Sequence, residues 1–343
     1  MFETNAAAAM EVKYMLIAGI ILTITAVVLS IAYWTYRTCF YSPKDRIEDP
    51  YAMLEGEQYE QISDLIRKCT AITEKKPFHW VEITAFDRTK LCGRYYHKTD
   101  GAPLIILFHG YRSCALRDCS GGFVLAHRLG FNVLAVDQRG HGRSSGTTIT
   151  FGVLERYDCL EWAKYAAQHL SCGAPILLSG LSMGAATVLM AAQLPLPKDV
   201  VGILADCPYS SPKDIIKKVC ADRNIPAKLT YPFVWLGAKL FGHFNLNASS
   251  AVNAITYTKV PILLYHGEDD RYVPCEMSRL IYNSNNHNCS LHTFPVAGHG
   301  LCYMVDPLRY EKVTYDFLNN IPEVADWLSK KNDNNILFDN SRK

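Results

Sequence analysis

From residue 103 onward, the apolar positions of the chain form short continuous runs separated by stretches of helical length. The runs cover residues 103–108, 131–136, 175–179, 200–205, 261–265 and 290–295. Continuous apolar runs are typical of parallel strands that are covered on both faces, whereas half-exposed strands alternate. The pattern therefore predicts an α/β fold with a mostly parallel central sheet and helices on both faces.

Two alternating segments precede these runs. Residues 80–86 and 90–96 are separated by Asp87-Arg88-Thr89, which predicts an N-terminal antiparallel hairpin. Apolar residues at helical spacing in 59–69 predict a short helix packed on the domain. We expect one domain over residues 50–330, followed by a loose polar tail over residues 331–343.

A membrane span is predicted near the N-terminus. Residues 15–34 contain no charge and are rich in Ile, Leu, Val and Ala, which suffices for a helix to cross a bilayer. Tyr33, Trp34 and Tyr36 fit an interfacial aromatic belt. A cleaved signal peptide is the alternative, but its apolar core is normally shorter, and Ser30-Ile31-Ala32 is a poor cleavage site.

The N-terminal region is therefore divided into three parts. Residues 1–13 form a tail, residues 14–36 an uncleaved transmembrane anchor, and residues 37–49 a polar linker. We expect these parts to stand outside the fold.

The sequence gives weaker signals for the side of the membrane on which the catalytic domain lies. Arg37, Lys44 and Arg46 follow the span and only Lys13 precedes it, which favours a cytoplasmic catalytic domain. The twelve cysteines lack C-x-x-C pairs and are interpreted as free, mostly buried thiols, which agrees with that side. Two N-x-S sequons, at Asn247 and Asn288, keep the extracellular face open.

Composition and motifs argue against nucleic-acid binding and against a metal-dependent function. The net charge is only +2 and no basic stripe is interleaved with aromatic residues, so no nucleic-acid partner is expected. The sequence has no H-E-x-x-H motif or Cys/His cluster, so we expect no metal and no cofactor.

The clearest chemical motif is Gly180-Leu181-Ser182-Met183-Gly184. It follows a predicted strand and opens an Ala-rich helix, the context of a nucleophile elbow. Glycines two residues either side allow a tight turn that exposes Ser182 at a helix N-terminus, where the helix dipole favours an alkoxide. We predict that Ser182 is a catalytic nucleophile.

A nucleophilic serine needs a base and an acid, which follow it in the order acid, then base, in such folds. His299 lies between two glycines after the last strand and is the predicted base. Glu268, Asp269 and Asp270 follow the strand before it, and residue chemistry alone leaves Asp269 and Asp270 open as the acid. The predicted oxyanion hole uses the backbone N–H groups of Met183 and Tyr111.

These motifs together resemble the α/β-hydrolase superfamily. The elbow, the loop His109-Gly110-Tyr111, the run 136–144 and the order of the catalytic residues carry the resemblance over about residues 50–320. Within the superfamily, the chain resembles membrane-anchored bacterial hydrolases of the lysophospholipase and serine-aminopeptidase-like group. The resemblance implies Asp270 as the acid, because 266–274 matches His-Gly-x-x-Asp-x-x-Val-Pro, and it implies structural roles for Asp137 and Arg139.

Residues 212–258 are too long for a simple crossover and predict a helical lid. Its aromatic residues fit either an acyl-binding wall or a surface that docks the lid on the core. The predicted pocket residues are Arg112, Tyr209, Tyr231, Phe233 and Trp235. Residues 212–242 carry six basic and two acidic side chains, a net charge of +4. This charge fits either contact with anionic lipid, with the apolar face of the first lid helix on the membrane, or an ordinary solvated face.

The sequence thus favours a membrane-bound serine hydrolase that cleaves carboxylic esters of apolar acyl groups, with lysolipids or monoacylglycerols as candidate substrates. A serine peptidase or amidase with the same triad is the alternative, and a catalytically idle membrane scaffold is a third hypothesis.

Overall fold

The computed structural model describes residues 2–44, 48–52 and 56–332. Within them, eight strands form one sheet in the order β1-β2-β4-β3-β5-β6-β7-β8. The strands are β1 (His79–Thr84), β2 (Lys90–Tyr96), β3 (Leu104–Phe108), β4 (Asn132–Val136), β5 (Ile176–Leu181), β6 (Val200–Asp206), β7 (Ile262–Gly267) and β8 (Cys289–Phe294). All pairings from β4 to β8 are parallel, and β1 and β2 form the antiparallel hairpin. The predicted fold class and hairpin are confirmed.

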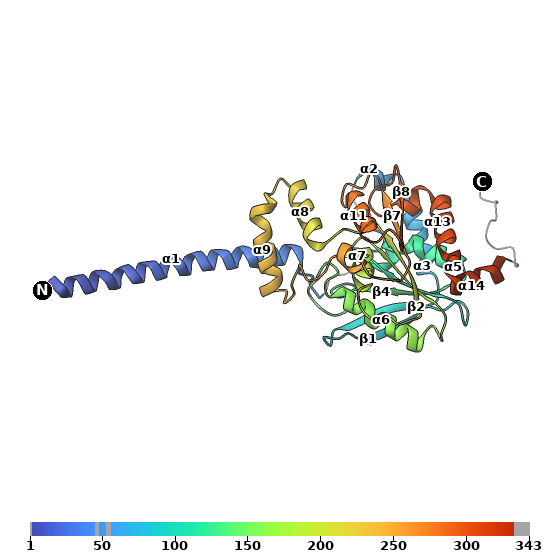
Figure 1. The fold of residues 1–343 in the computed structure, drawn as a ribbon, viewed down its shortest axis with the longest axis horizontal. Helices are drawn as coiled ribbons and strands as arrows, with labels where there is room; N and C mark the ends of the chain where they lie inside the picture. Colours follow the sequence, from blue (N-terminus) through green and yellow to red (C-terminus); the bar gives the residue numbers. More distant parts are fainter. Residues whose placement is uncertain (1, 45–47, 53–55, 333–343) are drawn as a thin grey trace.

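Helices cover both faces of the sheet (Figure 1). The helices that follow α1 are α2 (Glu57–Glu60), α3 (Ser63–Glu74), α4 (Ala115–Asp118), α5 (Ser120–Arg128), α6 (Glu155–His169), α7 (Met183–Ala191), α8 (Pro212–Asp222), α9 (Ala227–Leu240), α10 (Ala251–Ala254), α11 (Glu276–Ser284), α12 (Cys302–Val305), α13 (Pro307–Asn319) and α14 (Pro322–Asn332). The helix predicted at 59–69 is thus α3, which begins and ends several residues later. Residues 333–343 of the predicted tail lie outside the described residues.

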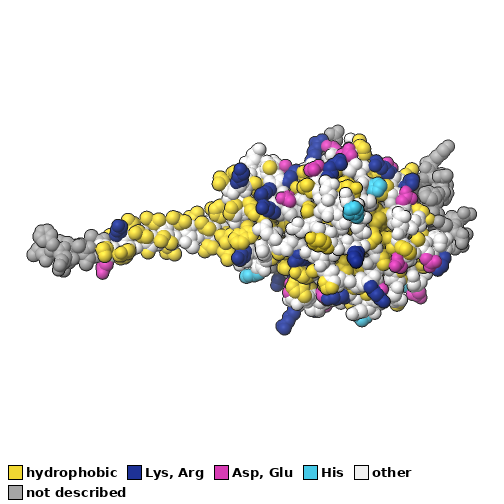
Figure 2. Space-filling model, viewed as in Figure 1, with side chains coloured by type: hydrophobic (Ala, Val, Ile, Leu, Met, Phe, Trp, Pro, Cys, Tyr) yellow, Lys and Arg dark blue, Asp and Glu magenta, His cyan; other side chains and the backbone are white. Residues whose placement is uncertain are grey.

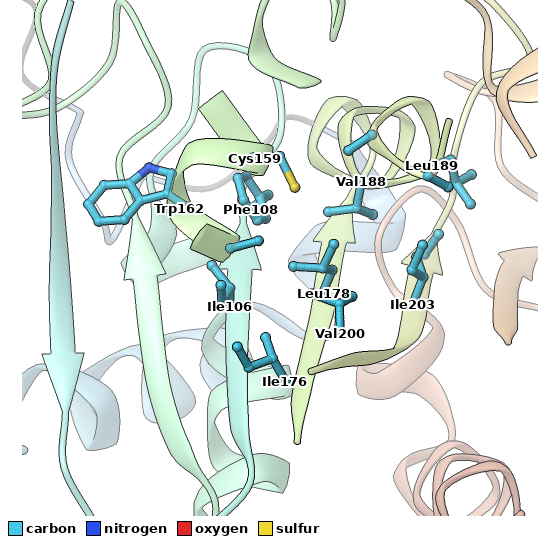
Figure 3. Close-up of a cluster of buried hydrophobic side chains, with 14 of the residues drawn as sticks. Ile106, Phe108, Cys159, Trp162, Ile176, Leu178, Val188, Leu189, Val200 and Ile203 are labelled. Carbon is cyan, nitrogen blue, oxygen red and sulfur yellow. The ribbon is translucent and has the colours of Figure 1, made fainter. Parts of the chain in front are cut away.

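The central strands supply side chains to two separate cores, because successive residues of a strand point to opposite faces. On one face, Ile106 and Phe108 of β3 pack with Trp162 of α6 and Val188 of α7 (Figure 3). On the other face, Ile105 and Leu107 belong to a core that includes residues of α5, α13 and α14. This double burial explains why the strands read as continuous apolar runs.

The N-terminal helix departs from the prediction. One helix, α1, runs from Phe2 to Cys39, so the predicted tail is helical and the helix continues beyond residue 36. Its stretch Met10–Cys39 is long and apolar enough to cross a membrane and is a candidate span. Most of it extends away from the domain, whereas its end meets α9 (Figure 1).

The last turns of α1 belong to the fold, so the expectation that the whole N-terminal region stands outside it is wrong. Ala32 and Phe40 are fully buried, and the Thr35 hydroxyl donates to the Phe233 carbonyl oxygen at 3.0 Å. A Cβ on Gly237 of α9 would lie 2.3 Å from the Ala32 carbonyl oxygen, so the two helices touch backbone to backbone. Small residues allow this approach, and the uninterrupted apolar run gave no sign of where the contact of α1 with the domain begins.

The chain beyond α1 is also attached rather than a free linker. The Ser42 hydroxyl donates to the Gly140 carbonyl oxygen at 2.6 Å, and Tyr41 pairs with Thr148 in an isolated β-bridge. Residues 45–47 of the predicted linker lie outside the described residues. The end of α1 is therefore held by the lid on one side and by the loop after β4 on the other.

The lid is shorter than predicted. Its helices α8 and α9 stand beside the end of α1 (Figure 1). In contrast, Ala251 and Ile255, at α10, lie in the core next to α7. The predicted lid over residues 212–258 is therefore corrected to α8, α9 and the turns that join them to the core, and the name lid is used in this sense below.

Candidate active site

The tight turn between β5 and α7 carries Ser182. Its backbone has φ +56° and ψ −112°, a conformation that a residue with a side chain adopts only under strain. The two flanking glycines are required sterically. A Cβ on Gly184 would lie 2.0 Å from the Phe108 carbonyl oxygen, and a Cβ on Gly180 would lie 2.3 Å from the carbonyl carbon of Gly184. The Gly-x-Ser-x-Gly pattern thus follows from how closely α7 approaches β3 and β5.

Three predicted residues from distant parts of the chain meet at this turn. His299 follows β8, and its Nε2 lies 2.9 Å from the Ser182 Oγ. Its Nδ1 lies 2.7 Å from the Asp270 Oδ2, on the turn after β7. This is the hydrogen-bonded chain that general-base activation of a serine requires.

The structure also distinguishes the two candidate acids. The Asp270 side chain is fully buried, and its Oδ1 accepts hydrogen bonds from the backbone N–H groups of Tyr272 and Val273 at 2.9 and 2.8 Å. Asp269 instead contacts Gln58 and Arg271 at the surface. Asp270 is therefore the carboxylate on His299.

The electrostatics of the pair are mutually reinforcing. Burial raises the pKa of Asp270, but His299 and His266 more than offset this, so that its pKa lies below the ordinary value. Burial lowers the pKa of His299, but the adjacent Asp270 carboxylate outweighs it, so that the pKa of His299 lies well above 6.5. Asp270 is thus ionised and favours the protonated imidazole.

Further residues, which the sequence interpretation missed, hold these loops in place. The Tyr59 hydroxyl donates to the His299 carbonyl oxygen at 3.0 Å, and the Gly300 N–H donates to the Cys207 Sγ at 3.3 Å. His266, whose ring is buried, lies 3.3 Å from Asp270 and hydrogen-bonds Ser278 and the Val273 carbonyl oxygen. His266 was visible in the sequence as part of the motif at 266–274, and Cys207 as part of the run Asp206-Cys207-Pro208-Tyr209.

Two buried groups near the site have donor atoms of the types that bind metals. They are Asp206, Cys207 and Cys302, and Cys207, His266 and Asp270, each with ligand atoms within 4.8 Å of one another. Both ring nitrogens of His266 and both carboxylate oxygens of Asp270 already take part in the hydrogen bonds described above. These side chains fit a hydrogen-bonded support for His299 better than a cation site.

The loop after β3 lies against the nucleophile. A Cβ on Gly110 would lie 3.6 Å from the Ser182 Cβ, and its N–H donates to Asp118 at 2.8 Å. Tyr111 follows in this loop, and Met183 is the first residue of α7. The two residues predicted to form the oxyanion hole therefore flank Ser182, one in the loop beside it and the other next in sequence.

A cavity of about 470 Å³ opens above Ser182 and His299. This volume is typical of small-molecule sites. Two of the predicted pocket residues, Arg112 and Tyr209, are among its lining residues, together with Ile216 of α8 and Val234 of α9.

The three lid aromatics predicted for the pocket do not line it. Val234 and Thr230 form the inward face of α9, whereas Tyr231 and Trp235, one position further along, contact Asn247 and Asn245. Phe233 instead contributes its carbonyl oxygen to the contact with α1. The prediction was wrong because aromatic content does not reveal which face of a helix points inward.

The end of α1 forms part of the cavity wall. Trp34, Thr38 and Cys39 are among the lining residues. The Tyr111 hydroxyl donates to the Cys39 carbonyl oxygen at 2.8 Å, and the Arg112 guanidinium donates to that of Thr38 at 2.9 Å. The loop beside the nucleophile is thus tied to the C-terminal carbonyl groups of the N-terminal helix.

Comparison with known proteins agrees with the fold. The chain belongs to the alpha/beta hydrolase family, whose model matches residues 105–313. It is similar to the uncharacterized protein YqkD of Bacillus subtilis, with 26% identity over 250 residues that cover 71% of this chain and 82% of YqkD. It is also similar to the human protein ABHD12B, with 29% identity over 196 residues, which cover 53% of this chain and 50% of that protein.

A similar solved structure is the esterase Pf2001 of Pyrococcus furiosus. It has a TM-score of 0.58 and 23% identity, and the match covers 78% of this chain and 97% of the esterase. At this identity the likeness concerns the fold. Family and fold together identify a hydrolase.

Proposed function

We propose that this protein is a serine esterase that cleaves carboxylic esters of apolar acyl groups, such as lysolipids or monoacylglycerols. The observation that carries the proposal is the hydrogen-bonded chain Ser182–His299–Asp270 at the base of a mainly apolar cavity. Apolar pockets with few polar groups suit an acyl chain, and Ser182 and His299 are among the polar residues that line this one.

The mechanism follows from the geometry. His299 accepts the Ser182 proton at Nε2 while Oγ attacks the ester carbonyl carbon, and Asp270 stabilises the imidazolium. The N–H groups of Met183 and Tyr111 stabilise the oxyanion. The imidazolium then returns its proton to the leaving alcohol, which leaves an acyl-serine, and a water activated by His299 releases the acid and regenerates Ser182.

The charges around the cavity favour an ester over a peptide with a free amino terminus. Arg112, Arg117 and Arg223 are among the lining residues. The lining carboxylate Asp118 is paired with Arg117 at 3.2 Å and accepts the Gly110 N–H. This positive charge would repel a cationic amino group, whereas it would not repel a neutral ester and would attract a lipid phosphate.

The test compares p-nitrophenyl esters of increasing acyl length with aminoacyl-p-nitroanilides, using the full chain in detergent. We expect turnover of the esters, with KM falling as the acyl chain lengthens, and slow turnover of the anilides. Faster turnover of the anilides would support the peptidase alternative instead.

We propose further that α1 is an uncleaved single-pass anchor. Its last turns pack on α9 and line the cavity, and cleavage after Ala32 would remove the buried Ala32, whose carbonyl oxygen lies against Gly237. The same chain can therefore span a bilayer and complete its own active site.

The proposed location of the catalytic domain is the cytoplasm. It is supported by Arg37 and Lys44 after the span and by twelve cysteines that, all being in the described part of the chain, form no disulfide there. Protease added to intact cells should leave residues 50–343 uncut. Digestion of that part in unbroken cells would place the domain outside.

A further inference from the structure

Helix α9 contacts α1 near the C-terminal end of the apolar stretch of α1. Lys13 and Arg37 bracket the apolar stretch of α1 and are 24 residues apart in the helix, roughly 36 Å at the usual rise per residue. A hydrocarbon core of about 30 Å fits between them. Because α9 touches α1 at Ala32 and Thr35, just before Arg37, α9 lies where the span leaves the hydrocarbon.

The orientation of α9 fits a membrane interface. It lies across α1 rather than along it (Figure 1). If α1 runs along the membrane normal, α9 therefore lies along the membrane plane, as interfacial helices do.

The outer face of α9 carries the side chains that such a helix needs. Leu229 is 70% exposed and Leu240 is 42% exposed. They are eleven residues apart, which is about three helical turns, so they lie on the same side of the helix. Each leucine is directly preceded by a lysine, Lys228 or Lys239, and both lysines are also exposed. Val234 and Ala238 on the opposite side are buried.

This face continues the apolar surface of α1. Tyr33 and Trp34, at the end of the span, are exposed, and the Tyr33 ring lies 5.1 Å from that of Phe241, just after α9. Figure 2 shows the hydrophobic surface of α1 running into the lid, with basic side chains beside it. Aromatic and basic side chains are the usual residues at this depth of a bilayer.

The other lid helix has a different role from the one its pattern indicated. Ile215 and Ile216 of α8 are buried and line the cavity, so this part of the apolar face of α8 is turned inward and is not available to lipid, and only Val219 of this face is exposed, at 39%. The nitrogens of Lys213 and Lys217 lie 5.9 Å from the centre of the Tyr231 ring on the outside of the lid. Helix α8 thus adds positive charge, whereas α9 provides the apolar contact.

The mouth of the cavity lies beside this surface. The exposed residues that also line the cavity are Trp34 and Thr38 of α1, Val219 of α8, Arg223 just after α8, and Tyr272 on the turn after β7. We propose that the outer face of α9 rests in the interface of the membrane that α1 spans, so that single-chain amphiphiles enter the cavity from that leaflet. The proposal deepens the proposed function and rests on its membrane anchor and ester chemistry.

Photocrosslinking tests the docking without any use of catalysis. The full chain is placed in nanodiscs of phosphatidylcholine and phosphatidylserine, with Leu229→p-benzoylphenylalanine or Leu240→p-benzoylphenylalanine. The matched control is the same change at Leu308 of α13, which is 78% exposed and lies away from α1 and the lid (Figure 1). We expect lipid adducts at 229 and 240 and none at 308. Absence of adducts at 229 and 240, or equal adducts at 308, would overturn the proposal.

Kinetics test the consequence for substrate entry. Leu229→Asp combined with Leu240→Asp should reduce hydrolysis of a monoacylglycerol in the nanodisc about tenfold, since interfacial binding scales with the apolar area buried. Hydrolysis of soluble p-nitrophenyl acetate should be unchanged, and Leu308→Asp should affect neither. Equal loss on both substrates, or no loss, would refute entry from the leaflet. If the wild type cleaves neither ester, the proposed function fails, and crosslinking still decides whether α9 docks.

Discussion

Replacement of Asp270 by asparagine isolates the contribution of the buried carboxylate. Its Oδ2 accepts from the His299 Nδ1 at 2.7 Å, and its Oδ1 accepts two backbone N–H groups. Because those two N–H groups hold the amide oxygen of the introduced asparagine in the Oδ1 position, its amide nitrogen faces Nδ1 and favours the His299 tautomer with its proton on Nε2. That tautomer cannot accept the proton of Ser182.

The expected loss in kcat is about 10⁴-fold, the cost of the corresponding change in serine hydrolases, which equals about 5.5 kcal/mol of transition-state stabilisation. The assay is steady-state hydrolysis of p-nitrophenyl butyrate, with circular dichroism to show that the variant is folded. The matched control is Asp269→Asn, whose carboxylate contacts Gln58 and Arg271, and it should lose less than about threefold. A folded Asp270→Asn variant with near-normal kcat, or a larger loss at position 269, would refute the role assigned to Asp270.

The site and its contact with α1 lead to three further predictions. Activity requires neutral His299, whose pKa is raised, so kcat/KM should fall with decreasing pH from a midpoint above 6.5; a midpoint below 6.5 would contradict the Asp270–His299 pairing. Removal of residues 1–29 should preserve hydrolysis of a soluble ester in detergent. Removal of residues 1–42 should abolish this hydrolysis and lower Tm by several degrees, because the longer truncation uncovers the cavity wall and deletes the buried Phe40. Equal activity of the two truncated proteins would show that the end of α1 is dispensable. Gly237→Val should lower Tm relative to wild type more than Gly122→Val in α5 does, because a side chain at Gly237 meets the backbone of α1, whereas the nearest atom to a Cβ at Gly122 lies 3.9 Å away. Equal shifts would argue against the close helix contact.

The sheet and the chemical residues could be predicted because each leaves a local signal. Burial on both faces makes continuous apolar strands, and the approach of α7 to β5 and β3 makes glycine unavoidable at Gly180 and Gly184. The turn after β7 carries two adjacent candidate acids for His299, Asp269 and Asp270, and their positions in the sequence do not decide between them. The contact with His299, a pair of backbone N–H groups and burial distinguish Asp270 from Asp269, and residue chemistry alone reveals none of these.

The cavity walls could not be predicted in the same way. Val234 lines the cavity and Trp235 does not, a difference of one helical position that depends on how the lid sits on the core. The contribution of the end of α1 to the cavity also depends on tertiary packing. The residues that make its contact with α9, Ala32 and Gly237, are small and carry no chemical signature in the sequence. Specificity therefore depends on packing that only the folded chain shows.

The central claim is that Ser182 is the nucleophile, and covalent labelling tests it most directly. The full chain is treated with a fluorophosphonate probe, and the modified peptide is identified by mass spectrometry. We expect one adduct on Ser182, none in Ser182→Ala, and normal labelling in Ser113→Ala, which removes another serine hydroxyl from the cavity lining. Undiminished labelling of a folded Ser182→Ala variant would contradict the account.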